Sequence, residues 1–421
     1  MRSRTRSIRS IAVGLALIAA PALYSQDHVF ISPRPAEASD VLTPKAASGP
    51  CSLTPAVPTY LTEGPTDPVL HAPSIGTLRA VMLFVDFPDA VANETTPALF
   101  DRAVTAGRRW FAETSNGRFN VDVTPVHRWY RMPLPSSAYG LNNSLAFDLM
   151  HRYMSDAISL ANAEIDFSNY DAVFVISSAG AQLPRSPTFL GYPGDGVPVD
   201  GKDMRWGIAF GNDLREPQFG EHILIHEVQH ILGLPDLYLF SQPYPDFLRP
   251  AGGWDVMSLI RTAPHNLAWH KWKLGWLDTS AIHCASSTAE VVLTPLSSPS
   301  GTKAIVVKKD SDTALVAELR RPVGEEARLC DSGLLVYTVE ASVAHGSGPI
   351  QVHSAGTGED VDTIFRCGPK YNATFDLRAG KLSRYSDGEV AFEIVRASAQ
   401  EMVVRVVFQP EAASRRRPAR R

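Results

Sequence analysis

Residues 226–236 read His-Glu-Val-Gln-His-Ile-Leu-Gly-Leu-Pro-Asp, and this stretch predicts a metal-binding helix that ends in a sharp turn. His226 and His230 are four residues apart, so on a helix their imidazoles project from one face and can bind a single ion. Gly233 and the proline that follows end the helix, so the chain can return and bring Asp236 to the same ion. The spacing therefore predicts a zinc site with three ligands, His226, His230 and Asp236.

Glu227 lies between the two histidines on the expected metal helix. A carboxylate there is placed to take a proton from a water molecule at the metal, which is the general-base role in zinc-assisted amide hydrolysis. Three protein ligands with one open position are typical of a catalytic zinc, whereas a structural zinc is closed by four side chains. The alternative is a surface helix that happens to carry two histidines. His222 lies one turn before His226, and we expect it to lie outside the ligand set.

Residues 253–258, Gly-Trp-Asp-Val-Met-Ser, follow the third expected ligand by about twenty residues. In metzincin peptidases the extended zinc motif is accompanied by a methionine in a tight turn beneath the metal, the Met-turn. Met257 is the candidate for this residue. A lone methionine is otherwise core filler, and Met257 fits a core position under either interpretation.

With these motifs in place, the chain resembles the immune-inhibitor-A-type secreted metallopeptidases, a family with metzincin-like zinc sites. The resemblance spans roughly residues 78 to 340, through residues 80–89, 110–119, 166–171, 226–238, 253–258, 273–277, 317–321 and 332–337. It implies zinc-dependent proteolysis. Gln229 departs from the family pattern, because a small residue is common at its place, and no tyrosine stands where some metzincins keep one for the oxyanion.

The chain has 421 residues, which suggests two domains with extended ends. Four arginines ahead of an apolar run predict a signal peptide over residues 1–25, with an uncleaved anchor as the alternative. Residues 26–76, rich in Pro, Ser, Thr and Ala, predict a linker or short pro-segment. We expect a catalytic domain over residues 77–280, a second domain over residues 281–409, and a basic disordered tail over residues 410–421.

The expected catalytic domain has an α+β pattern. Apolar runs at residues 80–87 and 171–177 predict buried strands, and residues 119–126 alternate as a strand does. Residues 97–116 and 144–164 predict long amphipathic helices. Together they predict a metzincin-like domain in which helices pack on a mixed sheet and the zinc helix crosses it.

The C-terminal domain consists of short branched or alternating runs separated by turn residues. These runs are residues 291–293, 303–308, 314–319, 333–339 and, in two pieces, 389–407. Regular short strands without a helical period predict an antiparallel β-sandwich. We expect this domain to make no catalytic contribution. Its possible roles are support of the cleft and adhesion to a large substrate.

Four cysteines in an exported chain favour disulfide bonds. Three pairings are possible. We expect Cys51 with Cys284 and Cys330 with Cys367, because the first pair ties the N-terminal arm to the end of the catalytic domain. The alternative for Cys51 is a thiolate that blocks the zinc until the pro-segment is removed.

Two further sets of residues are candidates for function. His265 follows the predicted Met-turn and is a candidate donor to the oxyanion of a tetrahedral intermediate. Residues 191–203 carry Asp195, Asp200 and Asp203 among glycines and prolines, so Ca²⁺ binding is conceivable there, with a solvated loop as the alternative.

A net charge of −4 gives no electrostatic reason to expect nucleic-acid binding. We expect a monomeric, secreted, extracellular zinc endopeptidase that acts on proteins or peptides and is not inserted in a membrane once the signal peptide is removed. Trp269, Trp272 and Trp276 are expected in the core, with a substrate groove as the alternative. Two functions compete with this interpretation: a catalytically silent adhesion or binding protein that retains the fold, and a zinc hydrolase of a non-peptide amide.

Overall fold

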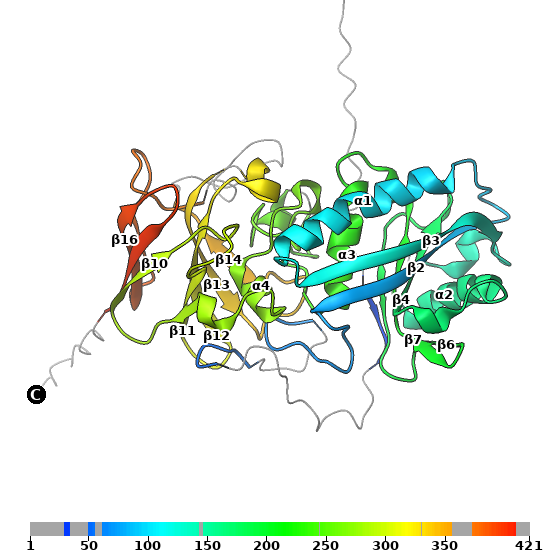
Figure 1. Cartoon of the computed structure of the whole chain (residues 1–421), viewed down its shortest axis with the longest axis horizontal. Helices are drawn as coiled ribbons and strands as arrows, with labels where there is room; N and C mark the ends of the chain where they lie inside the picture. The colour runs from blue at the N-terminus through cyan, green and yellow to red at the C-terminus, as the bar shows by residue number, and fades with distance from the viewer. Residues whose placement is uncertain are drawn as a thin grey trace, which may run out of the picture.

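The computed structural model has an α+β fold, as the sequence predicts. It describes residues 29–33, 49–54, 61–142, 146–243, 245–329, 331–355 and 373–409. The helices are α1 (Thr96–Thr114), α2 (Phe147–Ala161), α3 (Ile223–Ile231) and α4 (Ala268–Lys273). Figure 1 shows α1, α2 and α3 with a large sheet toward one end of the long axis, the C-terminal sheets toward the other end, and α4 between them.

The large sheet has six strands and is mixed. Their order is β1 (Val29–Ile31), β5 (Thr188–Leu190), β8 (Trp206–Phe210), β4 (Ala172–Ser177), β2 (Gly76–Asp86) and β3 (Phe119–Arg131). All neighbours are parallel except β5 and β8, which are antiparallel. The buried strands and long helices predicted for residues 80–177 are confirmed. A separate hairpin pairs β6 (Val197–Val199) with β7 (Lys202–Met204).

Both faces of this sheet are covered by helices. Alternate residues of β2 point to opposite sides, so Met82 packs in one buried cluster with α1 and α3, whereas Leu83 packs in another with α2. A strand that is buried on both faces reads as a continuous apolar run, which explains the sequence of β2. Gly107 of α1 lets α3 approach closely, because a Cβ atom there would lie 2.7 Å from Cδ2 of Leu224.

The C-terminal region forms two sheets. The first has the order β14 (Ile350–His353), β13 (Gly333–Glu340), β12 (Thr313–Arg320), β11 (Ala304–Lys308) and β9 (Ile282–Cys284). The second has the order β10 (Ala289–Leu293), β17 (Met402–Phe408), β16 (Val390–Ala397) and β15 (Arg384–Ser386). Neighbours are antiparallel except β11 and β9. Val336 of the first sheet and Val404 of the second belong to one buried cluster.

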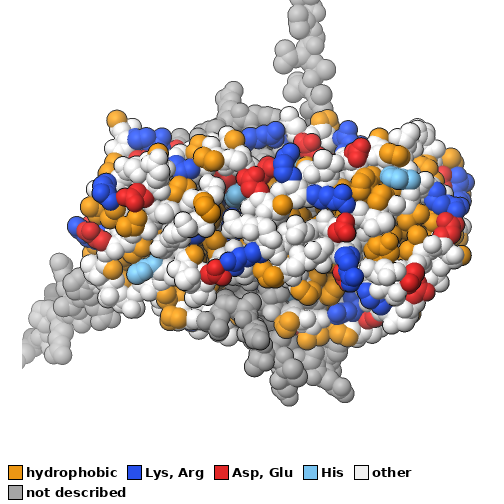
Figure 2. All heavy atoms as spheres, in the orientation of Figure 1, with side chains coloured by type: hydrophobic (Ala, Val, Ile, Leu, Met, Phe, Trp, Pro, Cys, Tyr) orange, Lys and Arg blue, Asp and Glu red, His pale blue; other side chains and the backbone are white. Residues whose placement is uncertain are grey.

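Short 3-10 helices connect these elements. They are η2 (Ser136–Tyr139), η3 (Phe167–Asn169), η4 (Asn212–Arg215), η5 (Gly220–His222), η6 (Asp246–Leu248), η7 (Ile260–Thr262), η8 (Thr279–Ala281) and η9 (Gly324–Arg328). On the face of the molecule in Figure 2, basic and acidic side chains are intermixed. Among the described residues, no helix is both long enough and apolar enough to cross a membrane.

Residues 61–75, which the sequence places in a linker or pro-segment, pack against the metal helix and its surroundings. The Ala72 N–H donates to the carbonyl oxygen of Ile231, the last residue of α3, at 3.0 Å. Lys273 donates to the carbonyl oxygens of Thr62 and Gly233. Leu70 is fully buried. These residues are therefore part of the folded core, and the strand β1 from the same predicted segment forms an edge of the large sheet.

The disulfide expected between Cys51 and Cys284 is present, with the two Cα atoms 5.8 Å apart. Since Cys51 is bonded to Cys284, it does not act here as a thiolate ligand. The pairing expected for Cys330 and Cys367 lies outside the described residues, as do residues 1–25 and 410–421.

Replacing both Cys51 and Cys284 with serine is expected to lower the free energy of unfolding by about 2–5 kcal/mol, because the bond closes a long loop in the unfolded chain. The bonded residues are separated by 233 positions. Urea unfolding of the oxidised wild type and the double variant measures the difference. Equal midpoints and slopes for the two proteins would contradict the expectation.

Candidate metal centre

The structure brings the three predicted ligands together. His226 and His230 lie on α3, Asp236 lies in the loop after it, and ligand atoms of all three lie within 4.8 Å of one another. Nε2 of His226 is 3.2 Å from Nε2 of His230 and 2.9 Å from Oδ1 of Asp236. Nε2 of His230 is 3.5 Å from the same Oδ1. All three side chains are fully buried.

The hydrogen bond of Nδ1 in each ligand imidazole determines whether Nε2 carries a lone pair for a metal. Nδ1 of His226 lies 3.1 Å from the carbonyl oxygen of Val256, and Nδ1 of His230 lies 2.8 Å from that of Leu234. A carbonyl oxygen only accepts hydrogen bonds, so both Nδ1 atoms carry the proton and both Nε2 atoms carry a lone pair in the neutral ring. Burial lowers the pKa of His230, which favours this neutral form.

Two lone pairs and a carboxylate oxygen therefore converge with no proton between them. Neither carboxylate oxygen of Asp236 accepts a hydrogen bond from the described residues. In a tetrahedral zinc site with bonds of about 2.0–2.2 Å, neighbouring ligand atoms lie about 3.3–3.6 Å apart. The three observed separations are close to this range, so His226, His230 and Asp236 fit a small divalent metal ion.

The chain reverses after α3 as the sequence predicts. Gly233 has φ +98°, its N–H donates to the carbonyl oxygen of His230, and the Leu234 N–H donates to that of Gln229. This is the left-handed helix end that glycine allows. A Cβ atom at Gly233 would lie 2.5 Å from Cγ2 of Thr66, so the packing of residues 61–75 also requires glycine here.

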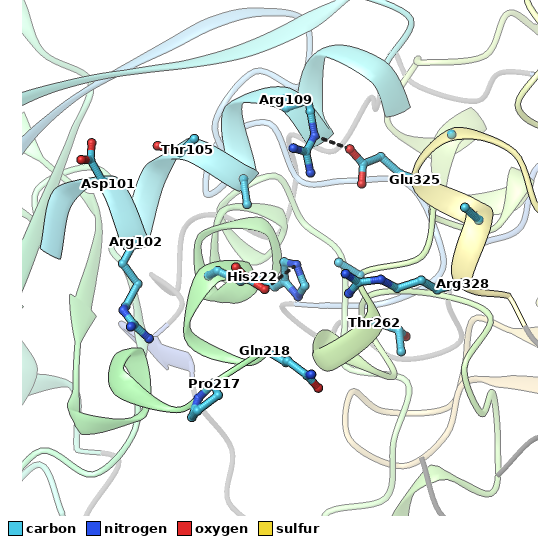
Figure 3. A pocket seen from close by; sticks show the side chains of 15 residues that line it. Asp101, Arg102, Thr105, Arg109, Pro217, Gln218, His222, Thr262, Glu325 and Arg328 are labelled. Carbon is cyan, nitrogen blue, oxygen red and sulfur yellow. Dashed lines mark hydrogen bonds and ion pairs between the residues drawn. The ribbon is translucent and has the colours of Figure 1, made fainter. Parts of the chain in front are cut away.

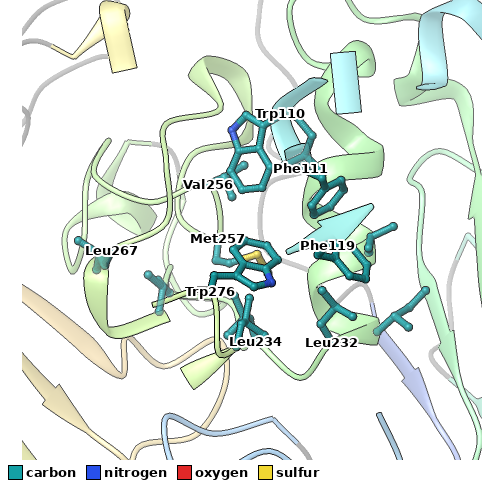
Figure 4. Packing of buried hydrophobic residues seen from close by; sticks show 14 of the residues in the cluster. Trp110, Phe111, Phe119, Leu232, Leu234, Val256, Met257, Leu267 and Trp276 are labelled. Carbon is teal, nitrogen blue, oxygen red and sulfur yellow. The ribbon is translucent and has the colours of Figure 1, made fainter. Parts of the chain in front are cut away.

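The turn that contains Met257 supports the ligands through its backbone. Val256 accepts from His226, and the Met257 carbonyl oxygen accepts from the N–H of Leu237, which follows the third ligand, at 3.0 Å. The Met257 side chain is fully buried near Trp276, as Figure 4 shows. Met257 is therefore a core residue, and its turn contacts the ligand helix and the ligand loop.

Glu227 lies beside the ligands and is 3% exposed. Its Oε2 accepts a hydrogen bond of 2.7 Å from the Thr188 hydroxyl group, and its backbone oxygen accepts a second, longer one from the same hydroxyl. Thr188 is the first residue of β5. The large sheet thus orients the carboxylate that the sequence predicts to be the general base.

A buried charge network lies behind the Met257 turn. Asp255 accepts hydrogen bonds from the Met257 and Leu267 N–H groups and lies 2.8 Å from Nδ1 of His270. Nε2 of His270 lies 3.0 Å from Oε1 of Glu63. Burial disfavours the imidazolium, but the charges of Glu63 and Asp255 outweigh burial and raise the pKa of His270 to about 10. One charged histidine thus joins residues 61–75 to the turn.

Residues of the C-terminal region also contact α4, the segment of the Met257 turn and the third ligand. Glu318 of β12 accepts from the first N–H of α4, that of Ala268, at 2.7 Å, and from the Tyr337 hydroxyl group at 2.7 Å. Arg320 donates to the carbonyl oxygen of Trp254 at 2.9 Å. Nδ1 of His345, in the loop after β13, lies 3.5 Å from Oδ2 of Asp236. No sequence motif pointed to Thr188, His270 or His345.

The side chain of His265 contacts Glu113 and Lys271 rather than the three ligands. It is buried, with Nε2 at 3.4 Å from Oε1 of Glu113 and Nδ1 at 3.4 Å from Nζ of Lys271. Its role as an oxyanion donor stays a prediction.

Two of the three aspartates considered for Ca²⁺ accept hydrogen bonds from the backbone. Asp200 accepts from the N–H of Phe167, and Asp203 accepts from that of Gly194. Within the described ranges, a cluster suited to a metal is found only at His226, His230 and Asp236. Trp269, Trp272 and Trp276 are all buried, as expected for core residues.

A surface cavity of about 900 Å³ lies beside the start of α3 and is distinct from the ligands. Figure 3 shows its wall, where Arg109 forms an ion pair with Glu325 of η9 at 2.6 Å. His222 lines this cavity, and its Nδ1 lies 3.1 Å from the carbonyl oxygen of Ile260. His222 is therefore not among the ligands, in agreement with the sequence.

Comparison of the sequence with protein-family models and with curated proteins found no match.

The charged form of His270 makes stability depend on pH. Its folded pKa is raised above the ordinary value of 6.5, so its contribution is present in full below about pH 6.5 and is lost as the pH rises through about 10. We expect His270→Gln to cost about 3–5 kcal/mol at pH 7, since two carboxylates lose their buried partner. Urea unfolding from pH 6 to 10 tests this. A variant whose stability falls as steeply as that of the wild type over this interval would refute the assignment.

Proposed function

We propose that this protein is a secreted zinc endopeptidase of the immune-inhibitor-A type. The observation that carries the proposal is the buried convergence of two imidazole lone pairs and the Asp236 carboxylate next to Glu227. Histidine nitrogens and one carboxylate suit zinc. The ligand set leaves a coordination position for substrate or water, which favours catalysis over a structural role.

When bound by these ligands, zinc would supply a Lewis acid that can polarise a carbonyl group and make water more acidic. Glu227 accepts the proton on its carboxylate and delivers it to the departing amine. Thr188 donates to Oε2 of Glu227 and so fixes the direction of the carboxylate. The carbonyl groups of Val256 and Leu234 hold the ligand imidazoles in the tautomer that leaves Nε2 for the metal.

Three further features support a metzincin-like catalytic domain, a C-terminal β-sandwich and secretion. A helix-covered mixed sheet with α3 packed against β5 and β8 suits a metzincin-like domain. Two largely antiparallel sheets that share a buried cluster favour a β-sandwich for the C-terminal region. The Cys51–Cys284 bond is of the kind that persists in oxidising compartments, which supports secretion.

One observation favours a second candidate. The three ligands are fully buried and Glu227 is 3% exposed, so these side chains present almost no surface to a substrate in this conformation. A catalytically silent adhesion or binding protein that retains the metal satisfies this observation. So does a latent peptidase in which the site becomes accessible before catalysis.

The first test pairs zinc content with casein hydrolysis for the secreted wild type and Glu227→Gln. We expect one zinc ion in each protein and hydrolysis by the wild type, reduced by about 10²-fold or more in the variant because proton transfer is lost. A chelator should abolish the wild-type activity. Zinc in both proteins without hydrolysis in either, even after limited proteolysis, would favour the binding protein, and absence of zinc would refute the metal centre.

A second pair of variants tests the orientation of Glu227. Thr188→Ser keeps the hydroxyl donor, whereas Thr188→Val keeps the shape and removes it. We expect kcat on casein to fall about tenfold for Thr188→Val, as for the loss of one hydrogen bond to a charged group, with Thr188→Ser close to wild type. Equal kcat values for the two variants would exclude this role for Thr188.

A further inference from the structure

A loop of the C-terminal region reaches the third ligand of the metal centre. His345 and Gly346 lie between β13 and β14, more than 100 residues after Asp236. His226 and His230 are placed by α3 itself, whereas Asp236 lies in a loop. Its position therefore depends on what that loop is bonded to.

Both backbone polar groups of Asp236 are bonded to this loop. The Asp236 N–H donates to Nδ1 of His345 at 3.2 Å, and the Gly346 N–H donates to the Asp236 carbonyl oxygen at 3.1 Å. Since Nδ1 of His345 accepts a backbone hydrogen bond, the neutral ring carries its proton on Nε2. The same Nδ1 lies 3.5 Å from Oδ2 of Asp236.

The contact continues along the ligand loop. The Phe240 N–H donates to the Gly346 carbonyl oxygen at 2.9 Å, and Leu239 and Ser347 form an antiparallel bridge. The His345 ring packs edge-on against Phe240, with centroids 4.9 Å apart, and against His230, with centroids 5.9 Å apart. These contacts fix the ring from two sides.

Gly346 makes this approach possible. Its φ is +70°, which favours glycine, and a Cβ atom would lie 2.1 Å from Cε2 of Phe240. The backbone of the loop therefore lies directly against the ligand segment, where no larger residue fits.

We propose that His345 is a positioning residue that completes the metal centre by fixing the backbone of Asp236. The C-terminal region is then part of the metal site, in addition to any role in support or adhesion. This inference rests on the metal centre of the proposed function. Groups that orient metal ligands typically change metal affinity by about 10–100-fold when they are removed.

The test uses the full-length protein and compares His345→Leu with His345→Asn. The Asn side-chain oxygen can take the place of Nδ1 as acceptor, whereas leucine cannot accept. The matched control is His353→Leu, since His353 lies in β14 of the same region and pairs with Thr338 at 2.7 Å. Zinc affinity is measured by competition with a chelator, and the Co²⁺-substituted proteins are compared by their visible absorption spectra.

We expect His345→Leu to bind zinc about 10–100-fold more weakly and to show an altered Co²⁺ spectrum, with His345→Asn and His353→Leu close to wild type. Equal zinc affinity and an unchanged Co²⁺ spectrum in His345→Leu would overturn the proposal, as would equal weakening in His353→Leu. If His345→Leu does not fold, His345→Gln replaces it, because the Gln side-chain oxygen lies one bond farther from the backbone than Nδ1 of histidine and so does not match its position. Equal affinities of the Asn and Gln variants then overturn the proposal.

These readouts separate this inference from the proposed function. A wild type that binds zinc tightly but does not cleave casein contradicts the peptidase, whereas the affinities of the His345 variants still decide the positioning role. A wild type that binds neither Zn²⁺ nor Co²⁺ overturns both.

Discussion

Two imidazole lone pairs and a carboxylate oxygen point at one another in a fully buried site, and this arrangement is unfavourable without a cation. The backbone groups around the site hold these three side chains in position, with their ligand atoms directed toward one point. Val256 and Leu234 hold the rings, and Gly233 turns the chain. Holding three acceptors together before the metal arrives costs folding free energy, and binding of the ion returns it, so metal affinity and stability are coupled.

The groups that support this centre come from distant parts of the chain. His270 carries a positive charge between Asp255, next to the Met257 turn, and Glu63 in the N-terminal segment. Arg320 of the C-terminal sheet donates to the backbone of that turn's Trp254. Buried ion pairs of this kind add little net stability compared with apolar packing, but they penalise any arrangement that separates the partners. Residues of the N-terminal segment, the metal helix region and the C-terminal sheet therefore depend on one another around the Met257 turn.

Local signals in the sequence predicted the parts of the site that are set locally. The four-residue spacing of His226 and His230, the helix end at Gly233 and the return of Asp236 all depend on helix geometry, and the structure contains them. The apolar runs likewise predicted the strands of both regions. Contacts between distant residues left no such signal: Thr188 lies 39 positions before Glu227 and His345 lies 109 after Asp236. Residues 61–75 lack periodicity because they pack as an irregular segment, so composition alone suggested a linker.

The Cys51–Cys284 bond has a consequence for any cut in the N-terminal segment. Residues 61–75 pack against α3, whereas Cys51 is joined to the strand that begins the C-terminal region. A cut between Cys51 and Leu61 divides the polypeptide, yet the piece that carries Cys51 stays covalently attached to the rest. On a denaturing gel, such a protein would migrate as a single species until the Cys51–Cys284 bond is reduced. Proteolysis at this place alone would leave the N-terminal piece tethered to the molecule. Its release would require a reductant, and a second cut before Cys51 would free only the residues that precede that cut.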